Sequence, residues 1–271
     1  MAKKRKKKNK AGDILLTVLL IVAIAVFCYA AFNLYHIYTE YKKGTDEYNQ
    51  IQQMAVTERD PDDIESEVID METDDYPTVP LDVDFDTLLG INDYVIGWLY
   101  VEAIDTISYP VVRGDDNEMY LHTTYEGKSN FAGTIFVDYE NNGDFNDCNT
   151  LVYGHNMKNG SMFGSLKNFV KDESYYQKSK YFWILTPKMN YRYEIIAAYT
   201  TGVDSETYTL FKGPGQEFAD YLERIKGYSE LKTDTVETDM MDKIVTLSTC
   251  TGNDATRFVV QGVRVDEVPV Q

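Results

Sequence analysis

Residues 243–265, KIVTLSTCTGNDATRFVVQGVRV, carry the pattern that decides the fold of this chain. Two runs rich in Val, Ile, Phe and Thr, at 243–250 and 257–265, have the composition of β-strands. Between them, residues 251–254 (TGND) are typical of a turn. The stretch therefore predicts two strands joined by a turn, with Cys250 ending the first strand and Arg257 opening the strand that returns.

Six further runs of the same character precede this pair, separated by turn-rich segments. They are YVIGWLYV (94–101), ISYPVVR (107–113), GTIFVDY (133–139), TLVYGH (150–155), YFWILT (181–186) and YRYEIIAAYT (191–200). Helical periodicity favours inserted helices at 161–179 and 216–228, and a short one with Phe85, Leu88, Leu89 and Ile91 on one face. Eight short strands separated by turns predict an all-β barrel or sandwich.

The charge is distributed unevenly along the 271 residues. Seven of the 26 basic residues lie in the first ten positions, so the rest of the chain sets 19 basic residues against 44 acidic ones. A body this acidic repels nucleic acid, and we expect no nucleic-acid partner. Three cysteines without a CxxC pair and three widely separated histidines give no metal-ligand spacing, so we expect neither a metal nor another cofactor.

Residues 14–32 form an uncharged, apolar run of 19 residues directly after the basic N-terminus. A helix of that length spans about 28 Å, close to the hydrocarbon thickness of a bilayer. Flanking basic residues stay in the cytoplasm, which would place the remaining chain outside. A cleaved signal peptide is the alternative, but the run is long for one and residues 28–30 (CYA) make a poor cleavage site.

These features predict four parts along the chain. They are a basic cytoplasmic tail (1–12), a transmembrane signal anchor (13–35), an acidic extracytoplasmic stalk or linker (36–79) and a globular domain (80–271). Residues 33–57 suit a polar helix continuing from the membrane, and the ten carboxylates within 58–75 favour a solvated linker. The expected location is the cell membrane, crossed once.

Three chemically reactive residue types stand at expected strand ends. Cys250 and His155 each end a run, and Arg257 begins the last one. An imidazolium lowers the pKa of a neighbouring thiol and later protonates a leaving amine, while a guanidinium can stabilise an oxyanion. The three types together suit acyl transfer through a cysteine nucleophile. A structural cysteine and a surface histidine remain the alternative on pattern alone.

The sequence around these residues resembles the sortases, particularly class B. The segments TLVYGHNMKNGSMFGSL (150–166), TLSTC (246–250) and RFVVQGV (257–263) follow the order found in that family, and residues 93–141 are similar to the first part of its catalytic domain. The resemblance covers about 80–268. It implies a mainly β fold, an eight-stranded sortase-type β-barrel with added helices, preceded here by the N-terminal transmembrane helix.

The resemblance also implies a cysteine transpeptidase activity. Cys250 would attack the Thr carbonyl of a C-terminal sorting signal on a surface protein, and an amino group of a peptidoglycan stem or cross-bridge would resolve the thioacyl enzyme. His155 and Arg257 occupy the other two catalytic motif positions. The helix at 216–228 fits one that class B carries between its sixth and seventh strands. The residues implied to line the substrate groove are Asn117, Leu121 and Ser248, together with Thr201 and Tyr208 from that connecting loop. Calcium is not implied.

Two other functions remain open at this point. One is a sortase that polymerises pilins, in which a pilin lysine supplies the resolving amine. The other is a non-catalytic, surface-tethered scaffold whose Cys and His are structural, for instance with Cys148 bonded to Cys250. We expect Cys148 to be an exposed spare thiol, His122 to satisfy a structural hydrogen bond, and His36 to lie at the membrane interface.

Overall fold

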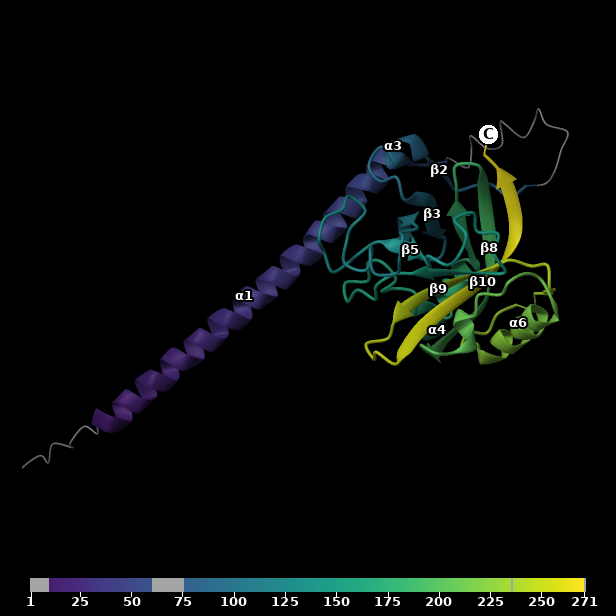
Figure 1. The fold of residues 1–271 in the computed structure, drawn as a ribbon. Helices are drawn as coiled ribbons and strands as arrows, with labels where there is room; N and C mark the ends of the chain where they lie inside the picture. The colour runs from purple at the N-terminus through teal and green to yellow at the C-terminus, as the bar shows by residue number, and fades with distance from the viewer. Residues whose placement is uncertain (1–9, 60–75, 235, 271) are drawn as a thin grey trace, which may run out of the picture. The chain divides into compact units, whose positions relative to one another are not determined.

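The computed structural model describes residues 10–59, 76–234 and 236–270, and its contacts divide the chain into two compact units, Met1–Lys43 and Gly44–Gln271. The first elements are α1 (Lys10–Ala55), β1 (Val56–Glu58), β2 (Leu81–Val83), α3 (Phe85–Leu89), β3 (Val95–Val101), β4 (Ser108–Val112), β5 (Ile135–Val137) and β6 (Asn149–Tyr153). They are followed by α4 (Asn168–Lys171), α5 (Ser174–Lys178), β7 (Tyr181–Leu185), β8 (Met189–Gly202), the 3-10 turn η2 (Glu206–Tyr208), α6 (Gln216–Tyr228), β9 (Ile244–Cys250) and β10 (Thr256–Pro269) (Figure 1).

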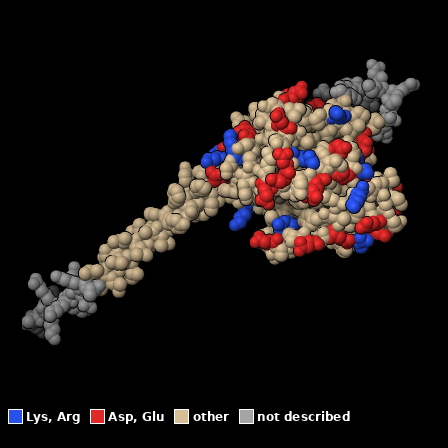
Figure 2. Space-filling model, viewed as in Figure 1, with Lys and Arg blue, Asp and Glu red and all other residues tan. Residues whose placement is uncertain are grey.

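Helix α1 contains the apolar run and ends in the barrel unit. No Lys, Arg, Asp or Glu occurs from Ile14 to Thr39, and this part of the helix is the tan rod of Figure 2. Its large apolar side chains are exposed, and among the described residues α1 is the one helix long and apolar enough to cross a membrane. The polar helix expected after the run extends to Ala55. Most of the acidic linker, 60–75, lies outside the described residues.

All eight predicted strands are present, and they close into a barrel in the order β10-β8-β7-β3-β4-β5-β6-β9. Of the two architectures left open by the sequence, the barrel is confirmed. Six of the neighbouring pairs are antiparallel, while β4 with β5 and β6 with β9 run parallel. A parallel pair needs a long crossover. Residues 113–134 supply it between β4 and β5, and the chain between β6 and β9, which includes α4, α5 and α6, supplies the other.

The barrel unit also includes chain that precedes the expected start at residue 80. Residues from Gly44 onward belong to it, and β1 pairs with β2 in a two-stranded sheet that the sequence did not predict. Runs of three residues are too short to show a periodic pattern. The strand β1 is one such run, directly after a long helix.

Two predicted helices differ in extent from the observed ones. The segment 161–179 contains only the short helices α4 and α5, because residues 155–167 form successive tight turns. In these turns a Cβ at Gly164 would lie 2.2 Å from the carbonyl oxygen of Met157, so the backbone packs too closely for a helix there. Helix α3 buries Leu88, whereas Leu89 is exposed; the helix ends at Leu89, and Ile91, beyond it, is exposed as well.

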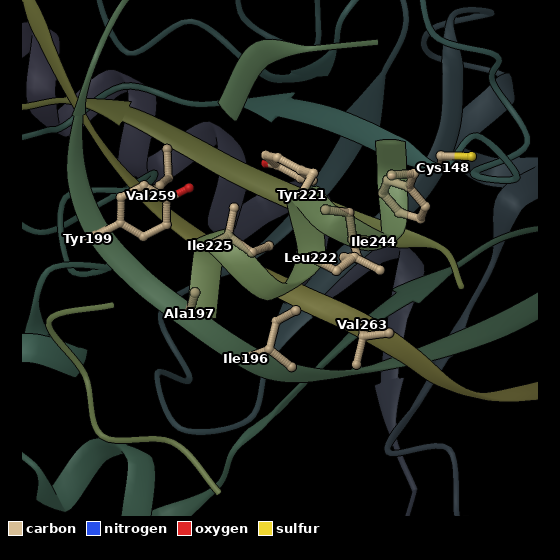
Figure 3. Packing of buried hydrophobic residues seen from close by; sticks show 11 residues of the cluster. Cys148, Ile196, Ala197, Tyr199, Tyr221, Leu222, Ile225, Ile244, Val259 and Val263 are labelled. Carbon is tan, nitrogen blue, oxygen red and sulfur yellow. The ribbon is translucent and has the colours of Figure 1, made fainter. Parts of the chain in front are cut away.

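Helix α6 spans 216–228 as predicted and follows the sixth barrel strand, β8, in the chain; its buried side chains lie against residues of β8, β9 and β10 (Figure 3). Its four buried apolar residues pack in one cluster with side chains of the barrel wall: Ile196, Ala197, Tyr199, Ile244, Val259 and Val263. Cys148 belongs to the same cluster and is 2% exposed. The prediction of an exposed thiol is therefore wrong, because this distant helix covers the polar loop that contains Cys148.

A buried polar network lies under the connection between β8 and β9. The fully buried side chain of Gln261 accepts a hydrogen bond from the Tyr199 hydroxyl (2.8 Å) and donates to the hydroxyls of Tyr221 (2.8 Å) and Thr246 (2.9 Å). Thr246 in turn donates to Asn149, whose amide donates to the carbonyls of residues 207 and 209 (3.1 and 3.2 Å). The network thus fixes the turn η2, which contains Tyr208, to the barrel wall.

Candidate active site

Cys250 and Arg257 face each other across the last two strands. Cys250 is the final residue of β9, and it is paired directly with Arg257 in the antiparallel ladder with β10. Directly opposed residues in such a ladder project from the same face of the sheet. Cys250 is a free, partly buried thiol, so the structure gives no disulfide with Cys148. The local hairpin therefore places a thiol beside a permanent cation.

His155 reaches the same place through the parallel pairing of β6 with β9. Tyr153 is in register with Ser248, so two further positions along each chain place His155 level with Cys250. The backbone continues this alignment, since Gly154 N–H donates to the Ser248 carbonyl (3.1 Å) and the Asn156 side chain donates to the Cys250 carbonyl (2.7 Å). A side chain at 154 would collide with the ring of Phe163, whose Cγ would lie 2.8 Å from the added Cβ, so glycine lets the chain pass there.

A pocket of about 220 Å³ brings these groups together. It is lined by Asn117, Glu118, Leu121, Phe136, Tyr153, Gly154, His155, Ser248, Thr249, Cys250 and Arg257. Two larger cavities, of about 470 and 580 Å³, lie beside β1–β2 and beside α5 and β7. Neither is lined by a cysteine or a histidine. The smaller pocket is the better candidate because it combines a nucleophile, an acid/base group and a cation.

The imidazole of His155 is held by a backbone carbonyl. Its Nε2 lies 2.6 Å from the Leu121 carbonyl oxygen, and since a carbonyl only accepts, Nε2 must donate. The nitrogen left for proton transfer is Nδ1. The ring of His122 stacks on it, with ring centres 5.5 Å apart and planes within 13°. Burial lowers the pKa of His155, the Leu121 carbonyl opposes this, and His122 lowers it further. The neutral ring is therefore favoured near neutral pH.

The Arg257 guanidinium is steadied by the turn it follows. One terminal nitrogen donates to the carbonyls of Asp254 (3.0 Å) and Thr256 (2.9 Å). A guanidinium has five N–H donors, so others remain for a ligand in the pocket. The short turn after Cys250 thus orients the cation as well as reversing the chain.

Three of the five expected groove residues line this pocket, namely Asn117, Leu121 and Ser248. The Asn117 side chain is partly engaged, because it donates to Asp138 (2.9 Å) and accepts from the Tyr139 N–H (3.1 Å).

The other two expected residues, Tyr208 and Thr201, are not among those lining the pocket. The Tyr208 hydroxyl is hydrogen-bonded to Ser248 (2.9 Å), so Tyr208 contacts a residue that lines the pocket without lining the pocket itself. Thr201 lies within β8 rather than in the loop, and its hydroxyl donates to Ser205.

Several residues of the pocket were missed from the sequence. Glu118, Phe136, Tyr153 and Thr249 line it, and each neighbours a motif that pointed to this region. Thr249 has a buried hydroxyl without a hydrogen-bond partner. The expectation for His122 was wrong: its ring stacks on His155 and makes no hydrogen bond within the part of the chain described. No group of three potential metal ligands occurs among the described residues.

A closed eight-stranded barrel with Cys, His and Arg at one rim is the arrangement expected of a sortase. The family model for the sortase domain matches residues 99–265, and the chain therefore belongs to the sortase family.

The similar proteins and structures are class B sortases. Sortase B of Listeria monocytogenes is 38% identical over 179 residues, which cover 65% of this chain and 71% of the relative. The crystal structure of sortase B from B. anthracis in complex with AAEK1 is 31% identical with a TM-score of 0.68, covering 84% of this chain and 99% of that one. Sortase B of Clostridium perfringens is 33% identical with a TM-score of 0.62, covering 68% and 100%.

Proposed function

We propose that this chain is a membrane-anchored class B sortase, a cysteine transpeptidase that attaches surface proteins to peptidoglycan. The observation that carries the proposal is the meeting of Cys250, His155 and Arg257 in one pocket. The substrates would be surface proteins that carry a C-terminal sorting signal. The acceptor would be an amino group of a peptidoglycan stem or cross-bridge.

In the first half-reaction the Cys250 sulfur attacks the carbonyl carbon of the Thr residue in the sorting signal. The thiol proton passes to Nδ1 of His155, the nitrogen that the Leu121 carbonyl leaves free. Arg257 stabilises the oxyanion of the tetrahedral intermediate through hydrogen bonds that strengthen as charge develops. When the intermediate collapses, the C–N bond breaks and His155 returns the proton to the leaving amine. The product is a thioester on Cys250.

The second half-reaction runs the same steps in reverse with a different amine. An acceptor amine attacks the thioester carbon and gives a proton to neutral His155, and Arg257 again holds the oxyanion. Collapse then expels the Cys250 thiolate, which His155 reprotonates. The neutral ring favoured by burial is the form that both attacks require.

Helix α1 supports the membrane part of the proposal. Its exposed apolar residues suit a lipid environment, and seven basic residues lie in the first ten positions. These residues would remain cytoplasmic, which would put the barrel on the extracytoplasmic side where cell-wall substrates occur. The groove-lining roles of Asn117, Leu121 and Ser248 belong to the same proposal, with Tyr208 and Thr201 further from the pocket.

The test is cleavage of quenched sorting-signal peptides by the full chain in detergent micelles. The Cys250→Ala variant should lose cleavage entirely, whereas Cys148→Ala, which removes a buried thiol outside the pocket, should retain it. Cleavage that survives Cys250→Ala, or no cleavage of any sorting-signal peptide, would favour the scaffold. Added amines, including a cross-bridge peptide, should appear in the product and accelerate turnover.

A second comparison separates catalysis from stability. Arg257→Ala should reduce turnover by roughly 100-fold, the usual loss when an oxyanion donor is removed. Arg192→Ala is the matched control, because Arg192 pairs with Asp266 at 2.6 Å and is not among the residues lining the pocket. The control should lower the melting temperature without a comparable loss of turnover. A larger melting change for Arg257→Ala than for the control would mark Arg257 as structural.

A further inference from the structure

The last turns of α1 belong to the barrel unit, and Tyr48 is buried there. This side chain is 4% exposed, although α1 is exposed over most of its described length. Its hydroxyl donates to the Gly133 carbonyl (2.5 Å) and lies 3.1 Å from the Thr134 hydroxyl oxygen. Burial raises the pKa of Tyr48, so the hydroxyl keeps its proton and remains a donor. Tyr48 therefore anchors the segment around residues 133 and 134.

That segment rests directly on the carbonyl that holds the His155 ring. Gly133 has a φ of +58°, and a Cβ there would lie 2.5 Å from the Leu121 carbonyl oxygen. Thr134 fixes both sides of Leu121: its N–H donates to the carbonyl of residue 120 (3.0 Å) and its hydroxyl to that of residue 123 (2.8 Å). The position of the Leu121 carbonyl thus depends on the segment that Tyr48 anchors.

Tyr48 also supports the chain that follows His155. Its ring meets the ring of Tyr109 edge to face, with centres 5.4 Å apart. The Tyr109 hydroxyl accepts from the backbone N–H of Met162 (3.0 Å), and the next N–H, of residue 163, donates to the His155 carbonyl (2.9 Å). One side chain therefore contacts the supports of both the imidazole and the backbone of His155.

We propose that Tyr48 is a positioning residue for His155, which makes the last turns of α1 part of the catalytic apparatus. The kinetic test of this inference rests on the proposed function, because it measures turnover; the spectroscopic test does not. Within the described residues, the Leu121 carbonyl is the hydrogen-bond partner of the His155 ring. Without the Tyr48 hydroxyl, residues 133–134 can shift, the carbonyl moves with them, and Nδ1 turns away from Cys250. Substrate contacts elsewhere in the groove are unaffected.

The kinetic test uses the full chain in detergent micelles and a quenched sorting-signal peptide. Tyr48→Phe should lower kcat by about tenfold and leave KM within about twofold. A tenfold loss corresponds to a small displacement of the imidazole, since a misplacement of a full ångström can cost roughly 100-fold in rate. Thr134→Val should act in the same direction, and Thr134→Ser, which keeps the hydroxyl, should restore the rate. Tyr193→Phe is the matched control, because it removes another fully buried hydroxyl, one bonded to Arg264. It should leave kcat unchanged.

A spectroscopic test needs no substrate. The chain has three histidines, so labelling histidine with ¹⁵N gives few ring signals, and the His155→Gln variant identifies the one required. The Nε2–H signal of His155 should be sharp in the wild type and in Tyr193→Phe, and broadened or absent in Tyr48→Phe. An unchanged signal together with unchanged kcat in Tyr48→Phe and Thr134→Val would overturn the inference. A wild type that cleaves no peptide would defeat the proposed function alone, and the ring signal would still decide the role of Tyr48.

Discussion

The buried side chain of Gln261 offers a stability prediction whose size follows from its contacts. Replacing it with leucine, which has a similar volume, removes three hydrogen bonds and creates little cavity. Each partner keeps one alternative: Tyr199 bonds the Thr207 hydroxyl (3.0 Å), Thr246 bonds Asn149 (2.8 Å), and Tyr221 has only a 3.5 Å contact. The cost is therefore close to the net value of the bonds, about 1 kcal/mol each, rather than the full desolvation of three stranded groups.

We accordingly expect Gln261→Leu to lower the free energy of unfolding by about 3 kcal/mol. For a domain of this size, such a loss corresponds to a fall in melting temperature of about 6–12 °C. Urea unfolding of the full chain in micelles measures the free energy, and an unchanged slope would show that the native state is still compact. Gln53→Leu, the same change at an exposed position of α1, should stay within about 0.5 kcal/mol.

The same variant tests whether the network serves the site. Asn149 ties the chain on both sides of Tyr208 to the barrel, and Tyr208 contacts Ser248 in the pocket wall. Gln261→Leu should therefore raise KM for the sorting-signal peptide by a few fold while kcat changes less. A stability loss below about 1 kcal/mol would refute the reasoning, since it would mean that the buried amide contributes no more than one ordinary hydrogen bond.

Three further outcomes follow from the site. His122→Gln removes a group that lowers the pKa of His155, so the pKa of His155 should rise. The acid limb of the pH profile of kcat/KM should then move to higher pH, and an unmoved limb would contradict the role of the stacked pair. Gly133→Ala requires a side chain at φ +58° and a Cβ against the Leu121 carbonyl, so urea unfolding should show a loss of about 2 kcal/mol or more together with a fall in kcat. Glu118→Gln removes a carboxylate that lines the pocket and should raise KM about two- to fivefold for a cationic amine acceptor, but not for the peptide, in competition assays with the amine varied.

The strands were predictable because each is a short run of β-branched and aromatic residues bounded by turn residues. All eight runs form strands, and the apolar stripe of 216–228 is buried as its period indicates. Burial that depends on a distant element was not predictable. The polar residues around Cys148 indicate an exposed loop, and only the position of α6 in space makes this thiol part of the core.

In the site, too, local features could be predicted from the sequence and long-range contacts could not. Cys250 and Arg257 are seven residues apart on either side of a turn, so their proximity could be predicted from the local pattern. The support of His155 could not, because the Leu121 carbonyl is a backbone group and its identity leaves no mark in the sequence. Likewise the hydroxyl of Tyr48 acts on a residue 85 positions away, and the side-chain amide of Gln261 bonds residues 15, 40 and 62 positions away, yet neither position stands out from its neighbours in the sequence.

The pairing of β6 with β9 explains why residues so far apart in sequence can share one reaction. In a hairpin, the end of one strand lies beside the start of the next, and this brings Arg257, at the start of β10, beside Cys250, at the end of β9. A hairpin cannot place the ends of two strands side by side. In a parallel pair, both strands end at the same edge. Because β6 and β9 are parallel and in register, His155 and Cys250 both pass that edge at the same level. The crossover needed between parallel strands also contains α6 and the turn with Tyr208. The topology that aligns the acid/base group with the nucleophile therefore also brings Tyr208 against Ser248, a residue that lines the pocket.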